Sequence, residues 1–404
     1  MDADRFAAVL RTLIARPSRR TALCLLSGLG LAGLTSPTDA KKKHKHKKKC
    51  AKVGQRTRKR RKKCCKGLVE DGSGRCAQPA SPPCVPRACP ATGCGDLPDG
   101  CGGTLRCGCP ANQICLRRGV CRSCTVTCTG TPAQCGVTLQ TAISRGGTVY
   151  VCPGTYQGGF TLFDDAVTVI GAGDGTDAAR NTILDGNAAG RVLTINAGVG
   201  TVVLERLRIT GGSSATASGI SHGGTTLRMT ECTVSGNTSV DSSGGGILVG
   251  TGSTLEMTRC TVRDNRATSL TGIGTGGGIH AAGTTTLTDC LIEANEAANS
   301  GGGLFVIGGT MTLRGSTQVR ENYAGLGGGI AVAAGTNAAG TLVIAETCRV
   351  TENIAGKGFG GGIHRSSDGT VTLRGANPSP IVVNSCHENC VGSVPKCAAA
   401  PVSC

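Results

Sequence analysis

Five copies of one short motif recur along the second half of the chain. In each copy, three glycines precede an isoleucine or leucine, and an asparagine stands several residues before them. The glycine triplets begin at positions 244, 276, 301, 327 and 360. The asparagines are Asn237, Asn265, Asn295, Asn322 and Asn353, which lie 28, 30, 27 and 31 residues apart. Repeats of this period are typical of solenoids and propellers.

The residues within each repeat alternate between apolar and polar, as in TLRMTECTVSGN at 226–237. They are also rich in β-branched side chains, so the pattern predicts strands. No repeat has helical spacing, and propeller blades need about 40 residues, more than these repeats offer. We therefore predict an all-β fold, a right-handed parallel β-helix solenoid with three short strands in each coil.

Matching places in the repeats carry matching residues. The third residue before each asparagine is Val or Ile, and the fifth is a cysteine in four repeats: Cys232, Cys260, Cys290 and Cys348. Residues two apart in a strand share a face, so both columns are expected to point inward and stack. The asparagines would then form a ladder of side-chain amides. A metal or redox role for the cysteines is the alternative, and small buried thiols are favoured.

Further motifs carry the pattern toward the N-terminus: TLQTAI at 138–143, VYVCPGTY at 149–156, VTVIGAG at 167–173 and ITGG at 209–212. Together with the glycine triplets they resemble the pectin-lyase-like superfamily, especially its glycine-rich members with repeats like those of polymorphic outer membrane proteins. The resemblance covers residues 136–385, which we assign to the β-helix. It implies a right-handed parallel β-helix, and many relatives cut acidic polysaccharides.

The resemblance raises the question of catalysis. Lyases of the superfamily use clustered acids that bind calcium, and its hydrolases use grouped carboxylates. The weak candidates here are Asp164, Asp165, Asp174 and Asp185, and each has an ordinary explanation as a turn residue. Because a fold alone confers no activity, we expect a noncatalytic protein without a cofactor or metal. The alternative is a polysaccharide lyase or glycoside hydrolase, and only the lyase would use calcium.

One column is expected to face outward. The residues that follow the aliphatic residue of each glycine triplet are Leu248, His280, Phe305, Ala331 and His364. Strand alternation points them away from the core. They would either contact a partner or glycan, or be scattered surface residues, and the second interpretation is favoured because aromatic residues are few.

Residues 1–40 resemble a twin-arginine export signal. Arg19 and Arg20 precede an apolar stretch at 22–34, and small residues lead to a predicted cleavage after Ala40. A permanent membrane helix needs roughly 20 apolar residues, more than this stretch offers. We therefore expect an exported protein, secreted or at the cell surface, with no membrane span in the mature chain.

Residues 41–66 hold 16 Lys and Arg and no acid, which accounts for most of the net charge of +18. Like charges at this density predict a disordered segment. It would serve either as a spacer or as a tether to an anionic cell-envelope polymer or polysaccharide. A nucleic-acid partner is less favoured, because no folded basic surface is predicted. The polyanion-binding candidates are Lys41, Lys42, Lys43, Lys45, Lys47, Lys48, Lys49, Arg58, Lys59, Arg60, Arg61, Lys62 and Lys63.

Sixteen of the 25 cysteines lie between positions 50 and 152. In an exported chain they predict a disulfide framework, and we assign 67–135 to a cysteine-rich module. The stretch 89–121 resembles small CG…DGCGGTL.CG.C repeats of secreted bacterial proteins. A zinc site built on the close pair Cys121 and Cys124 is the disfavoured alternative. The pairing cannot be deduced from sequence. Four more cysteines are expected to staple a cap at 386–404.

Overall fold

The computed structural model describes residues 94–374, apart from positions 99, 118, 164, 165, 270, 271 and 367, together with scattered positions between 52 and 89 and the pair 390–391. The chain divides into two units, 1–83 and 84–404. In the first unit, β1 (Val69–Glu70) pairs antiparallel with β2 (Cys76–Ala77), and a disulfide joins Cys64 to Cys76. The predicted export signal and nearly all of the basic segment lie outside the described residues.

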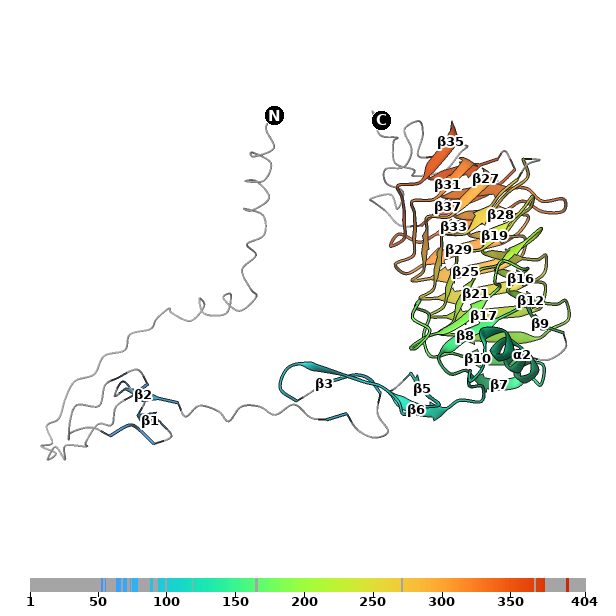
Figure 1. Cartoon of the computed structure of the whole chain (residues 1–404). Coiled ribbons are helices and arrows are strands. Elements are labelled where there is room, and N and C mark those ends of the chain that lie inside the picture. The colour runs from blue at the N-terminus through green and yellow to red at the C-terminus, as the bar shows by residue number, and fades with distance from the viewer. Residues whose placement is uncertain are drawn as a thin grey trace, which may run out of the picture. The chain divides into compact units, whose positions relative to one another are not determined.

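The second unit contains the predicted solenoid, a right-handed parallel β-helix (Figure 1). Three long parallel sheets run along it, and we number them in chain order. Sheet 1 contains β7 (Gly147–Tyr150), β10 (Val167–Ile170), β13 (Thr201–Glu205), β17 (Thr226–Thr230), β21 (Thr254–Thr258), β25 (Thr284–Thr288), β29 (Thr310–Arg314), β33 (Thr341–Ile344) and β37 (Thr370–Leu373).

Sheet 2 contains β8 (Gly154–Gln157), β11 (Thr182–Asp185), β14 (Arg208–Thr210), β18 (Thr233–Ser235), β22 (Thr261–Arg263), β26 (Leu291–Glu293), β30 (Gln318–Arg320) and β34 (Arg349–Thr351). Sheet 3 contains β9 (Phe160–Leu162), β12 (Leu193–Ile195), β16 (Ile220–His222), β20 (Ile247–Val249), β24 (Ile279–Ala281), β28 (Leu304–Ile307), β32 (Ile330–Ala333), β36 (Ile363–Arg365) and β38 (Cys390–Val391).

A fourth sheet corrects the prediction of three strands in each coil. Its strands directly follow the glycine or asparagine at the end of sheet 2 in six successive coils. Several of them are only two residues long, so they carry no periodic pattern that sequence could reveal. Sheet 4 contains β15 (Ser213–Ser214), β19 (Thr238–Ser239), β23 (Arg266–Ala267), β27 (Glu296–Ser300), β31 (Tyr323–Leu326) and β35 (Ile354–Phe359).

The core runs along the solenoid axis because neighbouring coils pair in register. In sheet 1, Leu204 stacks on Met229, which stacks on Met257 and then on Leu287. Each of these side chains is at most 2% exposed. Burial of one such side chain stabilises a fold by roughly 1.5–3 kcal/mol, and the stack repeats this contribution coil after coil.

The asparagines form a continuous buried ladder. The Nδ2 atom of each asparagine donates to Oδ1 of the asparagine in the next coil, over 2.9 to 3.0 Å from Asn237 to Asn353. Each Oδ1 also accepts the backbone N–H of the asparagine in the preceding coil. The side chains therefore bond the turns of successive coils where the chain leaves sheet 2.

The glycine triplets combine a positive φ angle at the first glycine with close backbone contact at the second. The first glycine has a left-handed backbone, as at Gly244 with φ of +71°. The second lies against the backbone of the next coil. A Cβ on Gly277 would stand 2.3 Å from the carbonyl oxygen of Glu296 and 2.5 Å from that of Gly302. No side chain fits there unless the coils move apart.

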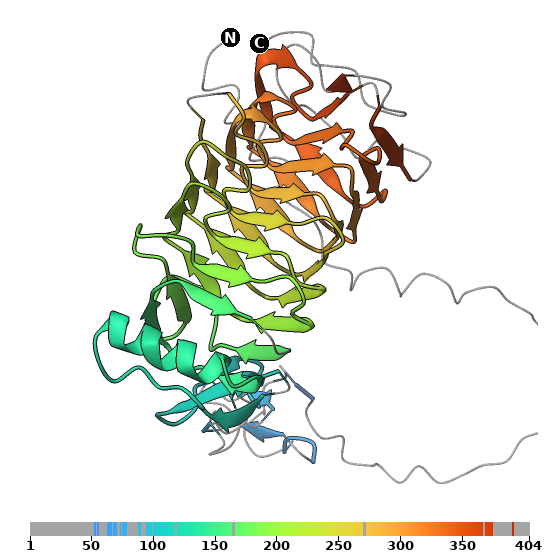
Figure 2. The ribbon, with the colours of Figure 1, turned by 90° about the vertical axis from the view of Figure 1, so that its right-hand side faces the viewer.

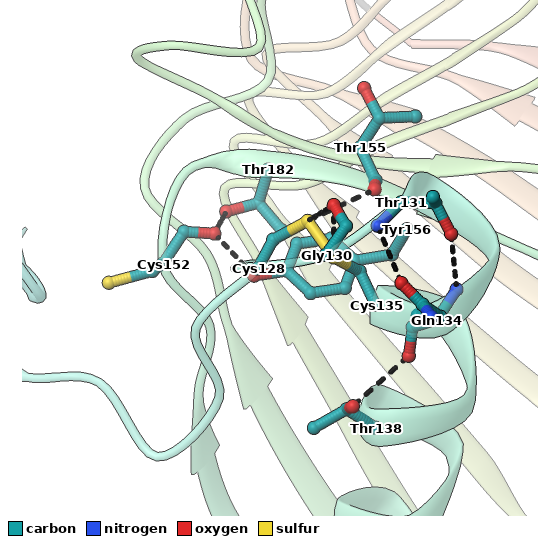
Figure 3. The surroundings of a disulfide bond; sticks show 10 residues. All are labelled: Cys128, Gly130, Thr131, Gln134, Cys135, Thr138, Cys152, Thr155, Tyr156 and Thr182. Carbon is teal, nitrogen blue, oxygen red and sulfur yellow. Dashed lines mark hydrogen bonds between the residues drawn. A yellow bond between two sulfur atoms is a disulfide. The ribbon is translucent and has the colours of Figure 1, made fainter.

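Helix α2 (Pro132–Ile143) covers the N-terminal end of the solenoid (Figure 2). A capping box starts it, in which Gln134 N–H donates to Thr131 Oγ1 and Thr131 N–H donates to Gln134 Oε1. The disulfide Cys128–Cys135 fastens the helix to the preceding segment (Figure 3). Leu139 and Ile143 of the helix join the core. The apolar strand edges at this end are thereby covered.

The segment before α2 consists of two hairpins closed by disulfides. Strand β3 (Gly95–Pro98) pairs with β4 (Thr104–Cys107), and β5 (Gln113–Leu116) pairs with β6 (Val120–Ser123). The described disulfides of this part include Cys89–Cys107, Cys94–Cys115, Cys109–Cys121 and Cys124–Cys152. The pair considered for zinc, Cys121 and Cys124, is thus oxidised to two separate disulfides. Apart from positions 390–391, the predicted C-terminal cap lies outside the described residues.

Candidate functional site

The two described acidic candidates accept hydrogen bonds from different parts of the chain. Asp174 accepts a hydrogen bond from Thr233 Oγ1 at 2.7 Å, and Asp185 accepts one from the backbone N–H of Asn187 at 2.8 Å. Asp164 and Asp165 lie outside the described residues. Asp185 therefore stabilises its own turn, whereas Asp174 links its loop to strand β18, 59 residues further along the chain.

Candidate metal ligands gather in one place within the described part of the chain. Cys94, Cys109 and Cys115 have sulfur atoms within 4.8 Å of one another. These sulfurs belong to the disulfides Cys94–Cys115 and Cys109–Cys121, so no thiolate is present to bind an ion.

Asp174 belongs to a small mixed-charge group on the outer side of sheet 2. Burial is the main cause that lowers the pKa of Arg208, and the charge of Arg263 lowers it further. Asp174 and Asp264 oppose that shift, and Arg263 forms an ion pair with Asp264 at 3.0 Å. Positive and negative groups alternate here, as on a solvated surface whose ion pairs contribute little to stability.

The four column cysteines are free, buried thiols inside the coil. Cys260 Sγ accepts the backbone N–H of Cys232 at 3.4 Å, and Thr317 Oγ1 accepts that of Cys290 at 3.2 Å. Burial raises the pKa of Cys260 far above its usual range. A hydrogen bond with Cys260, followed by burial, does the same for the pKa of Cys290. A neutral, sealed thiol is neither a metal ligand nor a nucleophile, so these side chains fill a narrow core.

The column predicted as a surface stripe lies on the outer side of sheet 3, as alternation requires, yet it is not open surface. Phe305 is 8% exposed and Ala331 is 1% exposed, while Leu248, His280 and His364 are half-buried. Thr275, the residue before the glycine triplet at 276–278, covers His280. Thr275 Oγ1 lies 3.0 Å from His280 Nδ1 and 2.7 Å from Ser243 Oγ. The expectation of an exposed stripe is therefore wrong. At His280 the side chain is covered by Thr275 and by the ring of Phe305, whose centroid lies 5.1 Å from that of His280.

Burial lowers the pKa of His280 from 6.5 to about 4. The unfolded chain therefore binds a proton near pH 6.5 that the folded chain takes up only near pH 4, and the free energy of unfolding falls as the pH falls through this window. We expect His280 to account for about 3 kcal/mol of that fall between pH 7 and pH 4. Urea unfolding at several pH values measures it.

The variant His280→Leu is the matched comparison, because Leu248 already occupies this column in the preceding coil. It removes the titrating group and keeps an apolar side chain. We expect a flatter dependence of stability on pH in the variant. Identical pH profiles for the two proteins would contradict the assignment.

The outer face of sheet 1 carries a feature that the sequence-based prediction missed. One column consists of seven threonines in seven successive coils, paired in register. Six more threonines occupy the two neighbouring outward columns. We call these thirteen residues the threonine face: Thr201, Thr226, Thr254, Thr284, Thr310, Thr341, Thr370, Thr286, Thr312, Thr372, Thr230, Thr258 and Thr288. The signal was available, since most strands of sheet 1 read Thr-x-x-x-Thr or Thr-x-Thr.

Ion pairs interrupt and border the N-terminal part of this face, and Arg228 and Glu256 occupy its middle column. Arg228 Nε lies 2.8 Å from Glu256 Oε2 on the adjacent strand. Glu231 pairs with Arg259 at 3.1 Å and with Arg117 of the second hairpin at 3.3 Å. The charges here are paired, so the face has little net charge.

A family model described as the right handed beta helix region matches residues 165–378. The chain belongs to this family. A search of curated proteins found no match. Among solved structures, the crystal structure of Escherichia coli YbhC aligns at 12% identity with a TM-score of 0.36, covering 61% of this chain and 83% of that one. A score this low carries no argument.

The family identity and the described geometry agree on a right-handed β-helix. The described geometry adds a disulfide-rich region before it. In the described part of this family member, no helix has the length and apolarity that a membrane crossing requires. Of the polyanion-binding candidates, only Lys63 is described, and it is exposed. The remaining twelve lie outside the described residues.

Proposed function

We propose that this protein is an exported, noncatalytic β-helix of the cell surface or extracellular matrix, with the role of an adhesin. Residues 41–63 would hold it to anionic polymers of the cell envelope. The observation that carries the proposal is the distribution of charge. Residues 41–66 have 16 basic groups and no acid, whereas residues 67–404 have 22 basic and 22 acidic groups. Such a segment binds polyanions by releasing their counterions.

Two further observations support the proposal. The chain has six described disulfides, which are typical of an oxidising environment outside the cytosol. Asp174 and Asp185 each serve a structural hydrogen bond, with Thr233 Oγ1 and with the backbone N–H of Asn187.

The test measures binding of the full chain to immobilised polyphosphate and polygalacturonate over a series of salt concentrations. We expect log affinity to fall linearly with log salt, and replacement of the basic residues of 41–63 by glutamine to abolish binding. A control variant replaces two exposed arginines of the solenoid unit, Arg145 and Arg180, and should bind as the original chain does. Equal binding by the 41–63 variant would contradict the tether.

The same preparation tests the noncatalytic half of the proposal. Polygalacturonate is incubated with the full chain, with and without calcium, and unsaturated uronides and reducing ends are followed. We expect no product. Product formation would establish the lyase or hydrolase alternative and direct attention to Asp164, Asp165, Asp174 and Asp185.

A further inference from the structure

The threonine face is selective for one side of the solenoid. Strands in general are enriched in β-branched residues, so general strand propensity does not explain a concentration of threonine on one sheet. On sheet 2, however, the outward positions that pair across six successive coils are mixed, and only two of them are threonine. They are Arg208, Thr233, Thr261, Leu291, Gln318 and Arg349. The seven-threonine column of sheet 1 therefore needs a cause beyond strand formation.

The hydroxyl groups of the threonine face are available to an outside partner. Within the described part of the chain, none of the thirteen forms a side-chain hydrogen bond with another protein group. All thirteen residues are half-buried or exposed, and none is fully buried. Each hydroxyl can donate one hydrogen bond and accept others, and each methyl group displaces loosely held water.

The spacing of these groups is fixed by the fold. Neighbouring parallel strands lie about 4.8 Å apart, and residues two apart along a strand are about 6.7 Å apart. Threonine has a restricted χ1 angle in a strand, so its hydroxyl and methyl groups are held in place. The asparagine ladder and the tightly packed glycines hold successive coils together. Both lie outside sheet 1, at the turn after sheet 2 and before sheet 3. The result is a preorganised array of hydroxyls. One column is continuous over seven coils, and the middle column is interrupted by Arg228, Glu256 and Val343.

We propose that the threonine face binds ice. Its two spacings lie close to the repeats of water oxygens on the prism faces of hexagonal ice, so ordered water on the array matches water in the crystal. Bridging waters of this kind are nearly as favourable as direct hydrogen bonds. From β17 to β37 the outward positions hold no aromatic residue, which a sugar-binding platform would use. Their charges are the ion pair of Arg228 with Glu256 and Arg314 at the margin.

The test uses the full chain in ice-recrystallisation and thermal-hysteresis measurements. We expect the protein to inhibit recrystallisation at micromolar concentration. The variants Thr286→Lys and Thr312→Lys place a long charged side chain in the middle of the array. Each should raise the concentration needed by about tenfold or more. Thr261→Lys, on the outer side of sheet 2, is the matched control and should behave as the original chain does. Circular dichroism verifies that all variants are folded.

Three results would overturn the proposal. The first is a folded chain without any effect on ice, or equal losses in Thr261→Lys and Thr286→Lys. The second is adsorption to microcrystalline cellulose or chitin that the same face variants abolish, which would assign the face to a crystalline polysaccharide. The third is a dimer that Thr286→Lys dissociates, which would assign it to a second copy of the chain. Residues 41–63 are unchanged in every variant, so the outcome is independent of the proposed tether.

Discussion

Replacement of Asn295 by alanine is expected to lower the free energy of unfolding by about 3–5 kcal/mol, because it leaves several buried groups without partners. The Nδ2 atom of Asn295 donates to the backbone oxygens of Val262 and Glu293 and to Oδ1 of Asn322. Its Oδ1 accepts from both nitrogens of Asn265 at 3.0 to 3.1 Å. The side chain is 1% exposed, so water does not replace these bonds. Urea unfolding followed by circular dichroism measures the loss.

Two further variants separate the hydrogen bonds from simple loss of volume. Asn295→Asp keeps the shape and the accepting oxygen but removes the donors, and we expect a loss comparable to that of the alanine variant at pH 7. Asn337→Ala changes an exposed asparagine and should alter stability by no more than about 0.5 kcal/mol. An Asn295→Asp protein as stable as the original would show that packing alone sustains the ladder.

Gly277→Ala is expected to destabilise the solenoid by about 3 kcal/mol, since the new Cβ would overlap backbone atoms of the next coil. The obstructing groups are the carbonyl oxygens of Glu296 and Gly302, at 2.3 and 2.5 Å. Backbone held by two sheets has no rotamer to change, so the coils themselves must separate. The backbone of Gly277 lies outside the left-handed region, so the expected cost comes from this overlap alone.

Gly190→Ala provides the control for that substitution. A Cβ at Gly190 meets no atom within 4 Å, and its backbone is also outside the left-handed region. We expect this variant to unfold at the same urea concentration as the original chain or slightly above it, because alanine restricts the unfolded chain. Similar losses in both variants would contradict a role for close coil contact at the triplets.

Much of the fold was predictable because a solenoid repeats each position in every coil. The 27- to 31-residue period located the asparagines, and alternation assigned the residues three and five before them to the core. All of these are buried in the structure. The same reasoning failed at Phe305, since alternation gives the side of a strand on which a residue lies and says nothing about what covers that side.

The candidate site was less accessible to sequence reasoning. The prediction searched for grouped acids, and the described acids, Asp174 and Asp185, accept hydrogen bonds from separate partners, Thr233 and Asn187. The threonine face was overlooked because its meaning depends on which strands are neighbours. Thr226, Thr254 and Thr284 are 28 and 30 residues apart in sequence and become adjacent only when the coils pair in register.

The sequence by itself determined the β-helix, the inward columns, the asparagine ladder and the separation of a basic segment from a charge-balanced remainder. These follow from local patterns that every coil repeats, so one period is sufficient to read them. Only the tertiary structure decided the fourth sheet, the disulfide pairing, the cover over His280 and the alignment of the threonine face. Each of these depends on which segments meet across coils or turns, and that contact is set by packing of the whole stack and not by any local residue pattern.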